Sequence, residues 1–142
     1  MYTFERTAKY YETDQMGIVH HSNYIRWFEE ARIALMEHMG IPYRVIEENG
    51  ILIPVLGVDC TYKHPIRFDE TIVFDLAIRG YNGVRFEVTY TGRHKATGQI
   101  SCTGTSRHCF TTRDLKPVRI KQQFPAWHEI FARAAAESDG KA

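Results

Sequence analysis

Residues 10–24 read YYETDQMGIVHHSNY, and the rest of the chain can be interpreted outward from them. Asp14 and Gly17 fall in a segment that predicts a loop, and Ser22 and Asn23 are good N-cap residues, so a helix is expected to begin there. The first backbone N–H groups of a helix have no partner inside it and carry partial positive charge. A carboxylate near such donors suits attack on an acyl carbonyl, whose oxygen becomes negative as it is attacked.

The next segment, residues 23–39, predicts a long helix that is covered on most of its sides. Its apolar residues form one seam at helical spacing, and further apolar residues widen that seam beyond a normal surface stripe. The seam holds Tyr24, Trp27, Phe28, Ala31, Leu35 and Met39, widened by Ile25, Ile33, Ala34 and Met36. Gly40 is expected to end the helix, with Pro42 just beyond it. A sheet that curls around the helix is the simplest cover.

Alternating apolar and polar residues elsewhere predict strands. The predicted strands cover residues 3–11, 52–62, 72–79, 84–91 and 99–111. Asn82-Gly83 predicts a type I′ hairpin, residues 43–49 a short helix, and residues 124–136 a terminal helix after a connector. The predicted fold class is α+β, with a curved antiparallel β-sheet wrapped around one long central helix.

Size and composition limit the possible classes of protein. The 142 residues suit one domain, residues 1–142, and 18 basic against 17 acidic residues give a net charge of +1. Nucleic acid and anionic membrane are therefore not expected partners. No apolar run approaches the roughly 20 residues of a membrane span, and no signal peptide is evident. Three cysteines without a CxxC spacing fit a reducing, cytoplasmic location.

A family resemblance rests on the pattern YxxxDxxGIVxHxxY at residues 10–24, continued by WFExAR at residues 27–32. The pattern resembles the signature of hotdog-fold acyl-CoA thioesterases. It is similar to the 4-hydroxybenzoyl-CoA thioesterase family, and most of all to its bacterial branch associated with the Tol–Pal system. The resemblance implies a hotdog fold, hydrolysis of acyl-CoA thioesters, no cofactor beyond the coenzyme A of the substrate, and a homodimer or homotetramer with its active sites at the dimer interface.

The resemblance also assigns roles by position. Asp14 matches the catalytic carboxylate, acting as nucleophile or general base. His21 matches the residue whose backbone N–H polarises the thioester carbonyl, where the aroyl-specific branch usually has Tyr, and Tyr10 matches a site tyrosine. The candidate substrate-binding residues are Gly17, Tyr24, Trp27 and Phe28. Near strand ends and turns, Lys63, Arg67 and Arg93 are candidates for holding the phosphates of coenzyme A.

Simpler roles compete with these assignments. An Asp before Gln-Met-Gly often makes only a turn contact, and Tyr10 can equally be a core aromatic. His20 and His21 are adjacent, and without a Glu-x-x-His or His-x-x-x-His spacing we expect no metal site. Cys102 lies mid-strand and is interpreted as a small apolar residue rather than a nucleophile.

Three functions remain open from the sequence. The first is an acyl-CoA thioester hydrolase, and the second is a non-catalytic acyl-CoA-binding, CoA-binding or scaffolding module of lipid metabolism. The third, less favoured, is a hydratase or dehydratase on the same fold. Acyl-carrier protein is an alternative acyl carrier, and the sequence does not fix the acyl preference.

Overall fold

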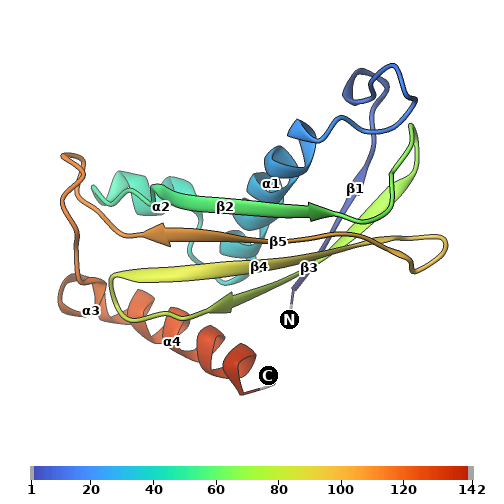
Figure 1. Ribbon diagram of the computed structural model, residues 1–142. Coiled ribbons are helices and arrows are strands. Elements are labelled where there is room, and N and C mark those ends of the chain that lie inside the picture. The colour runs from blue at the N-terminus through green and yellow to red at the C-terminus, as the bar shows by residue number, and fades with distance from the viewer. Residues whose placement is uncertain (1, 141–142) are drawn as a thin grey trace.

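The computed structural model describes residues 2–140, and its centre is a five-stranded antiparallel sheet. In sheet order, the strands are β1 (Tyr2–Thr7), β3 (Thr71–Arg79), β4 (Arg85–His94), β5 (Ile100–Cys109) and β2 (Val55–Tyr62). β1 and β2 therefore form the two edges of the sheet (Figure 1). The predicted α+β class is confirmed.

Helix α1 (Ser22–His38) is the long central helix, and it lies against one face of the sheet (Figure 1). Phe28 of α1 stacks on the ring of Tyr90 in β4, with 4.1 Å between ring centroids. Gly104 of β5 makes room for this ring, because a Cβ atom there would lie 2.6 Å from Phe28 and 2.5 Å from the Asp59 carbonyl oxygen. The sheet and the helix thus meet closely, and the hotdog arrangement is confirmed.

Within residues 2–140, three further α-helices complete the fold. Helix α2 (Tyr43–Glu48) follows α1, as the sequence predicts. Helix α3 (Ile120–Gln123) is too short to be predicted by periodicity, and α4 (Pro125–Asp139) extends the expected terminal helix by three residues. α4 packs beside β3, with Phe131 among the core aromatics (Figure 1). No helix within residues 2–140 is long and apolar enough to cross a membrane.

Two predictions about the strands and their turns are wrong. The first strand ends at Thr7 and not at residue 11, because Tyr10–Glu12 forms a 3₁₀ turn. The Glu12 carboxylate accepts the Lys9 N–H and so closes this turn. The β3–β4 connection is longer than a type I′ hairpin, which needs positive φ at both central residues. Of Asn82 and Gly83, only Gly83 has positive φ, and the Asn82 side-chain oxygen accepts the backbone N–H groups of Val84 and Arg85.

Candidate active site

A tight loop holds Asp14 in front of α1. Thr13 and Val19 pair across the loop, and the Asp14 N–H donates to the Ile18 carbonyl at 2.9 Å. Gly17 has a φ of +79°, which most residues with a side chain avoid, so glycine suits this turn. The Asp14 carboxylate accepts the Met16 N–H through Oδ1 at 2.9 Å. Within residues 2–140, its other oxygen receives no protein donor and is available for chemistry.

The start of α1 offers an unused backbone donor. The N-cap residue is His21, and the prediction that Ser22 or Asn23 caps the helix is wrong. Ser22 Oγ instead lies 2.8 Å from His20 Nδ1, and the Asn23 amide donates to the Glu12 carbonyl at 2.9 Å. The His21 N–H donates to no acceptor among the described residues. A carbonyl oxygen placed here would meet both this donor and the positive end of the helix.

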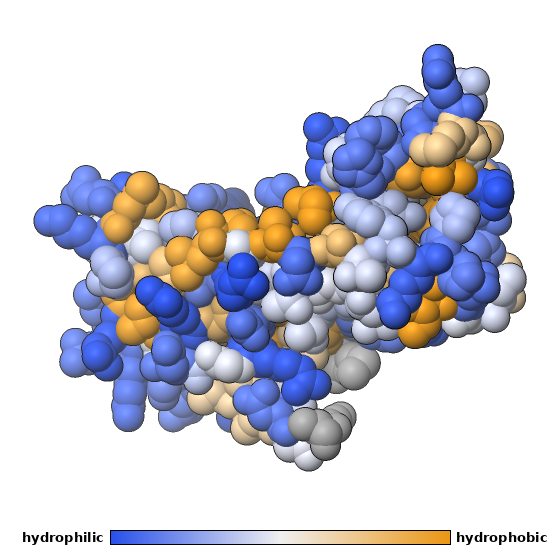
Figure 2. Space-filling model, viewed as in Figure 1, coloured by the Kyte–Doolittle hydropathy of each residue, from blue (hydrophilic) through white to orange (hydrophobic). Residues whose placement is uncertain are grey.

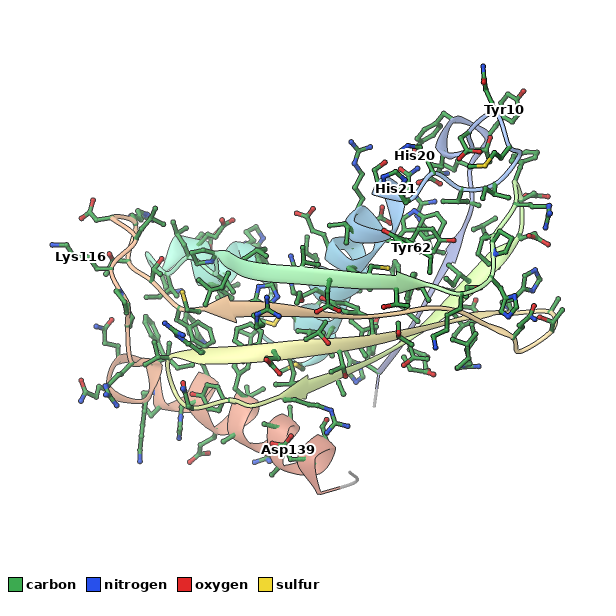
Figure 3. All side chains as sticks on the ribbon, in the orientation of Figure 1. Tyr10, His20, His21, Tyr62, Lys116 and Asp139 are labelled. Carbon is green, nitrogen blue, oxygen red and sulfur yellow. The ribbon has the colours of Figure 1, made fainter. Side chains whose placement is uncertain are left out.

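Asp14 and His21 line one pocket of about 270 Å³. The other lining residues are Met16, Ile18, Val19, Tyr24, Tyr62, Lys63, His64 and Pro65. Tyr62, at the end of β2, donates to the His21 carbonyl at 3.1 Å, and both lie at the start of α1 in Figure 3. Burial and the neighbouring Cys60 raise the pKa of Tyr62 to about 12, so its hydroxyl keeps its proton at neutral pH.

The structure brings four of the sequence-predicted site residues into this pocket and leaves others outside it. Those inside are Asp14, His21, Tyr24 and Lys63. Gly17 shapes the loop without lining the pocket. Tyr10 is 77% exposed and packs edge-on against Phe68, with 5.5 Å between ring centroids, so it is neither a core aromatic nor a pocket residue (Figure 3). Arg67 is exposed and also lies outside the pocket lining.

Trp27, Phe28 and Arg93 have other partners. The Trp27 and Phe28 rings are 0% and 1% exposed, so the structure places them in the core and not in the pocket with Asp14. Arg93 of β4 donates to both carboxylate oxygens of Asp75 on β3, at 3.0 and 2.9 Å. Its guanidinium is therefore already paired, which weakens the prediction that it binds a phosphate.

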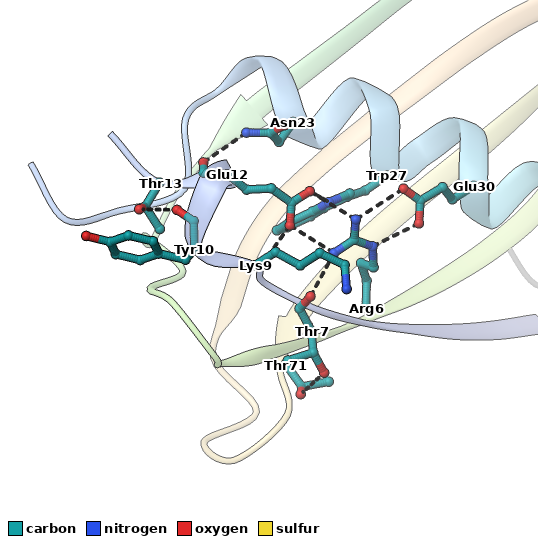
Figure 4. A network of polar contacts seen from close by, with 10 residues as sticks. All are labelled: Arg6, Thr7, Lys9, Tyr10, Glu12, Thr13, Asn23, Trp27, Glu30 and Thr71. Carbon is teal, nitrogen blue, oxygen red and sulfur yellow. Dashed lines mark hydrogen bonds and ion pairs between the residues drawn. The ribbon is translucent and has the colours of Figure 1, made fainter. Parts of the chain in front are cut away.

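A buried carboxylate that sequence reasoning missed fixes the loop to the helix (Figure 4). Glu12 is 4% exposed and accepts from the Arg6 guanidinium at 2.9 and 3.0 Å and from the Trp27 indole N–H at 2.9 Å. Burial opposes its ionisation, but these bonds, the Lys9 N–H and the charge of Arg6 outweigh burial and hold the pKa of Glu12 below its usual value. Arg6 also pairs with Glu30 at 2.8 Å. A buried indole N–H needs an acceptor. The position of Trp27 in the apolar seam was therefore the sequence signal that a buried acceptor lies next to it.

Comparison with known proteins agrees with the fold. A family model described as the thioesterase-like superfamily matches residues 9–128. The Bacillus subtilis protein YneP, provisionally named an acyl-CoA thioesterase, is 39% identical over 133 residues, which are 92% of this chain and 94% of that protein. A Staphylococcus aureus structure described as a DHNA-CoA thioesterase has a TM-score of 0.91 at 32% identity, covering 99% of this chain and 95% of that one. The 1,4-dihydroxy-2-naphthoyl-CoA hydrolase of Thermosynechococcus vestitus is 22% identical over 137 residues, 96% of this chain and 94% of that protein.

The chain therefore belongs to the thioesterase-like superfamily. Its fold is the hotdog fold of the solved structures that it matches.

Proposed function

We propose that the protein hydrolyses acyl-CoA thioesters to a free acid and coenzyme A. The observation that carries this proposal is the meeting of the Asp14 carboxylate and the unused His21 N–H in one pocket. The names of the relatives support the same reaction class. A thioester is an acyl carbonyl with a good leaving group, and these two groups are the minimum needed to attack it.

In the proposed reaction, the thioester carbonyl oxygen accepts the His21 N–H. Asp14 either attacks the carbonyl carbon directly, giving a mixed anhydride, or takes a proton from a water molecule that attacks. The carbonyl electron pair moves to the oxygen, which becomes an oxyanion facing the helix end. When the carbonyl re-forms, the C–S bond breaks and coenzyme A leaves as a thiolate that then takes up a proton. In the direct route, water hydrolyses the anhydride to complete the turnover.

The test of the reaction is thiol release from a panel of short-chain, long-chain and aromatic CoA thioesters. Asp14→Asn is expected to lower kcat by at least ~100-fold, the low end for removing a positioned base, with an unchanged thermal transition. Asp69→Asn is the matched control, because Asp69 lies outside the pocket lining and Asn tolerates its φ of 68°. Near-normal turnover by folded Asp14→Asn would refute this role of Asp14. CoA binding without thiol release by wild type would favour the non-catalytic module.

The same panel of thioesters tests which branch of the family the chain belongs to. His21 in place of the Tyr usual in the aroyl-specific branch supports the Tol–Pal-associated branch, while the DHNA-CoA thioesterase among the relatives supports an aromatic acyl group. We propose that the panel include aliphatic, benzoyl-type and naphthoyl-type thioesters, with one acyl-carrier-protein thioester. The ratio of kcat/KM values between classes then assigns the branch.

Lys63 is the cation best placed to hold a phosphate of coenzyme A, because it lines the pocket and is exposed. Lys63→Met is expected to raise KM several-fold for a CoA thioester and to leave unchanged the KM for the matching N-acetylcysteamine thioester, which has no phosphates. Arg93→Met is the control: its guanidinium is paired with Asp75, so KM should stay the same. Equal KM changes for both thioesters in Lys63→Met would contradict the phosphate role.

We also propose a homodimer joined at the β2 edge. Among residues 2–140, no strand pairs with the outer side of β2, and Val55, Leu56 and Val58 are 51%, 49% and 40% exposed. Hydrophobic side chains form a band over β2 in Figure 2. An unpaired apolar edge strand favours pairing with another chain. Val58→Glu should shift the protein from dimer to monomer in analytical ultracentrifugation, and a wild-type monomer at micromolar concentration would contradict the proposal.

A further inference from the structure

Arg32 of α1 is a buried cation without an acidic partner. It is 7% exposed, and no carboxylate within residues 2–140 pairs with its guanidinium. Nε donates to the Tyr43 hydroxyl at 3.1 Å and Nη1 to the Tyr90 hydroxyl at 3.2 Å. A guanidinium has further N–H donors beyond these two. Because buried charges in folded proteins are normally paired, the surroundings of Arg32 suit an anion.

The unused end of the guanidinium is not sealed inside the protein. Within residues 2–140, Nη2 donates to no acceptor, yet the only side-chain atoms both sealed from solvent and without a partner are Ser101 Oγ and His108 Nδ1. Nη2 therefore keeps contact with solvent. Arg32 lines a cavity of about 140 Å³, and so does Ser106, whose hydroxyl lies 2.7 Å from the Tyr90 hydroxyl that Nη1 contacts. These contacts place the free N–H groups at this cavity.

The remaining walls of the cavity are mainly apolar. Ile25 and Phe28 of α1 and Val55 and Val58 of β2 line it. Glu29 also borders it, but the Glu29 side chain is exposed, so water and salt screen its charge. A second charge on a ligand would lie unpaired beside these walls, whereas methyl and methylene groups gain by leaving water. The cavity therefore suits a monoanion with a small apolar part.

The shape of the cation and the size of the cavity narrow the choice of anion. The planar fork of a guanidinium matches the two oxygens of a carboxylate. A water molecule occupies ~30 Å³ in the liquid, so a cavity of about 140 Å³ holds about five non-hydrogen atoms of similar size. Acetate, propionate and butyrate bracket this size.

We propose that the Arg32 cavity is a binding site for a short-chain monocarboxylate, with its two oxygens on the guanidinium and its alkyl chain against the apolar walls. The cavity shares no lining residue with the pocket of Asp14. The proposal therefore goes beyond the thioesterase function and does not depend on it. A neutral molecule of the same shape leaves the charge of Arg32 without compensation, and a longer acid exceeds the cavity.

The test is isothermal titration calorimetry of the full chain with sodium propionate, at an ionic strength held constant with sodium sulfate. Propionate is expected to bind with a Kd between about 10 µM and 10 mM, the range open to so small a ligand. Propionamide has the same shape and no charge, so it should bind at least about 10-fold more weakly. Acetate should bind about fourfold more weakly because it lacks one methylene. Hexanoate should also bind more weakly than propionate, because it overfills the cavity.

Substitutions assign the binding to Arg32. Arg32→Met should lower the affinity for propionate by at least about 10-fold and abolish the preference over propionamide. Arg26→Met is the matched control, because Arg26 is exposed on the same helix, and should keep the wild-type affinity. If Arg32→Met does not fold, Arg32→Lys replaces it. Lys keeps the charge but not the planar fork, so propionate should bind more weakly and still better than propionamide.

Four results would overturn the proposal. The first is no binding of any of these acids at about 100 mM, ten times the weakest Kd expected. The second is equal binding of propionate and propionamide by wild type. The third is an unchanged affinity in a folded Arg32 variant, because the acid would then bind elsewhere. The fourth is binding of chloride, added as sodium chloride, as tight as that of propionate, because the apolar walls would then contribute nothing. Thiol release tests the proposed function separately from all four.

Discussion

Two buried polar networks lie against helix α1, and they differ in how their charges are balanced. The first network consists of Arg6, Glu12, Trp27 and Glu30, near the helix start. The second consists of Arg32, Tyr43, Tyr90, Ser106 and His108, farther along the helix. In the first, every charge faces an opposite charge. In the second, one cation is held only by neutral groups.

This difference separates a network with balanced charges from one that holds an uncompensated cation. The balanced network has no donor left for a ligand and ties the loop of Asp14 to the helix. The unbalanced network has a charge that its own residues do not neutralise. A buried, unpaired charge lowers stability unless something else compensates it. We therefore expect substitutions in the first network to lower stability more than substitutions in the second.

Glu12→Ala should have the largest effect on stability. It leaves the Trp27 indole and one side of the Arg6 guanidinium without an acceptor in a buried place, at a cost of about 3 kcal/mol. Glu30→Ala is the control, because Glu30 is 43% exposed and an exposed pair contributes below about 1 kcal/mol. Urea unfolding measures both variants. Equal losses would show that the buried acid is not the centre of this network.

The pH dependence of stability should separate the two networks. Burial and the nearby Arg32 charge lower the pKa of His108 to about 3. The unfolded chain therefore binds a proton below the ordinary pKa of 6.5 that the folded chain does not bind, and stability falls as pH falls through this window. The loss between pH 7 and pH 5 should be about 2 kcal/mol in wild type and small in His108→Gln.

The pKa of Glu12 is lowered by folding, so its contribution has a different pH window. It is fully present above the ordinary value of 4.5 and disappears as pH falls below it. His108→Gln should therefore still lose stability below pH 4.5. Unfolding curves at pH 7, 5 and 3.5 measure both windows. A wild-type loss confined to pH values below 4.5 would contradict the role given to His108.

Arg32→Met should destabilise the protein less than Glu12→Ala, by about 1 kcal/mol. Replacing a buried, unpaired charge by an apolar side chain removes a desolvation cost and loses two hydrogen bonds to tyrosines. The measurement is the urea midpoint at pH 7, compared with Arg26→Met. A loss as large as that of Glu12→Ala would mean that the Arg32 network is primarily structural.

Ser22→Ala should have the smallest effect, a few tenths of a kcal/mol. A capping Ser would be worth about 1 kcal/mol, but the Ser22 hydroxyl contacts His20 and caps no backbone N–H of α1. The thermal transition measures the change. A loss near 1 kcal/mol would indicate that Ser22 caps the helix in solution.

The sequence predicts those parts of the fold that depend on local periodicity. The apolar seam of residues 23–39 predicts α1, and alternation predicts the strands. The pairing of Asp14 with the start of α1 followed from a local motif. The roles of Glu12 and Arg32 could not be predicted from the sequence, because they depend on which groups surround these residues after folding. The capping prediction failed for the same reason: the Asn23 amide found a buried carbonyl in another segment.

The glycine beneath the central aromatic stack affects how a mutational survey of this protein would be interpreted. Any side chain at position 104 would collide with Phe28 and with the Asp59 backbone, so the helix could not dock on β5. A survey scored by activity alone would rank Gly104 with Asp14. A parallel survey scored by abundance would separate them, since only the glycine is required for the chain to fold.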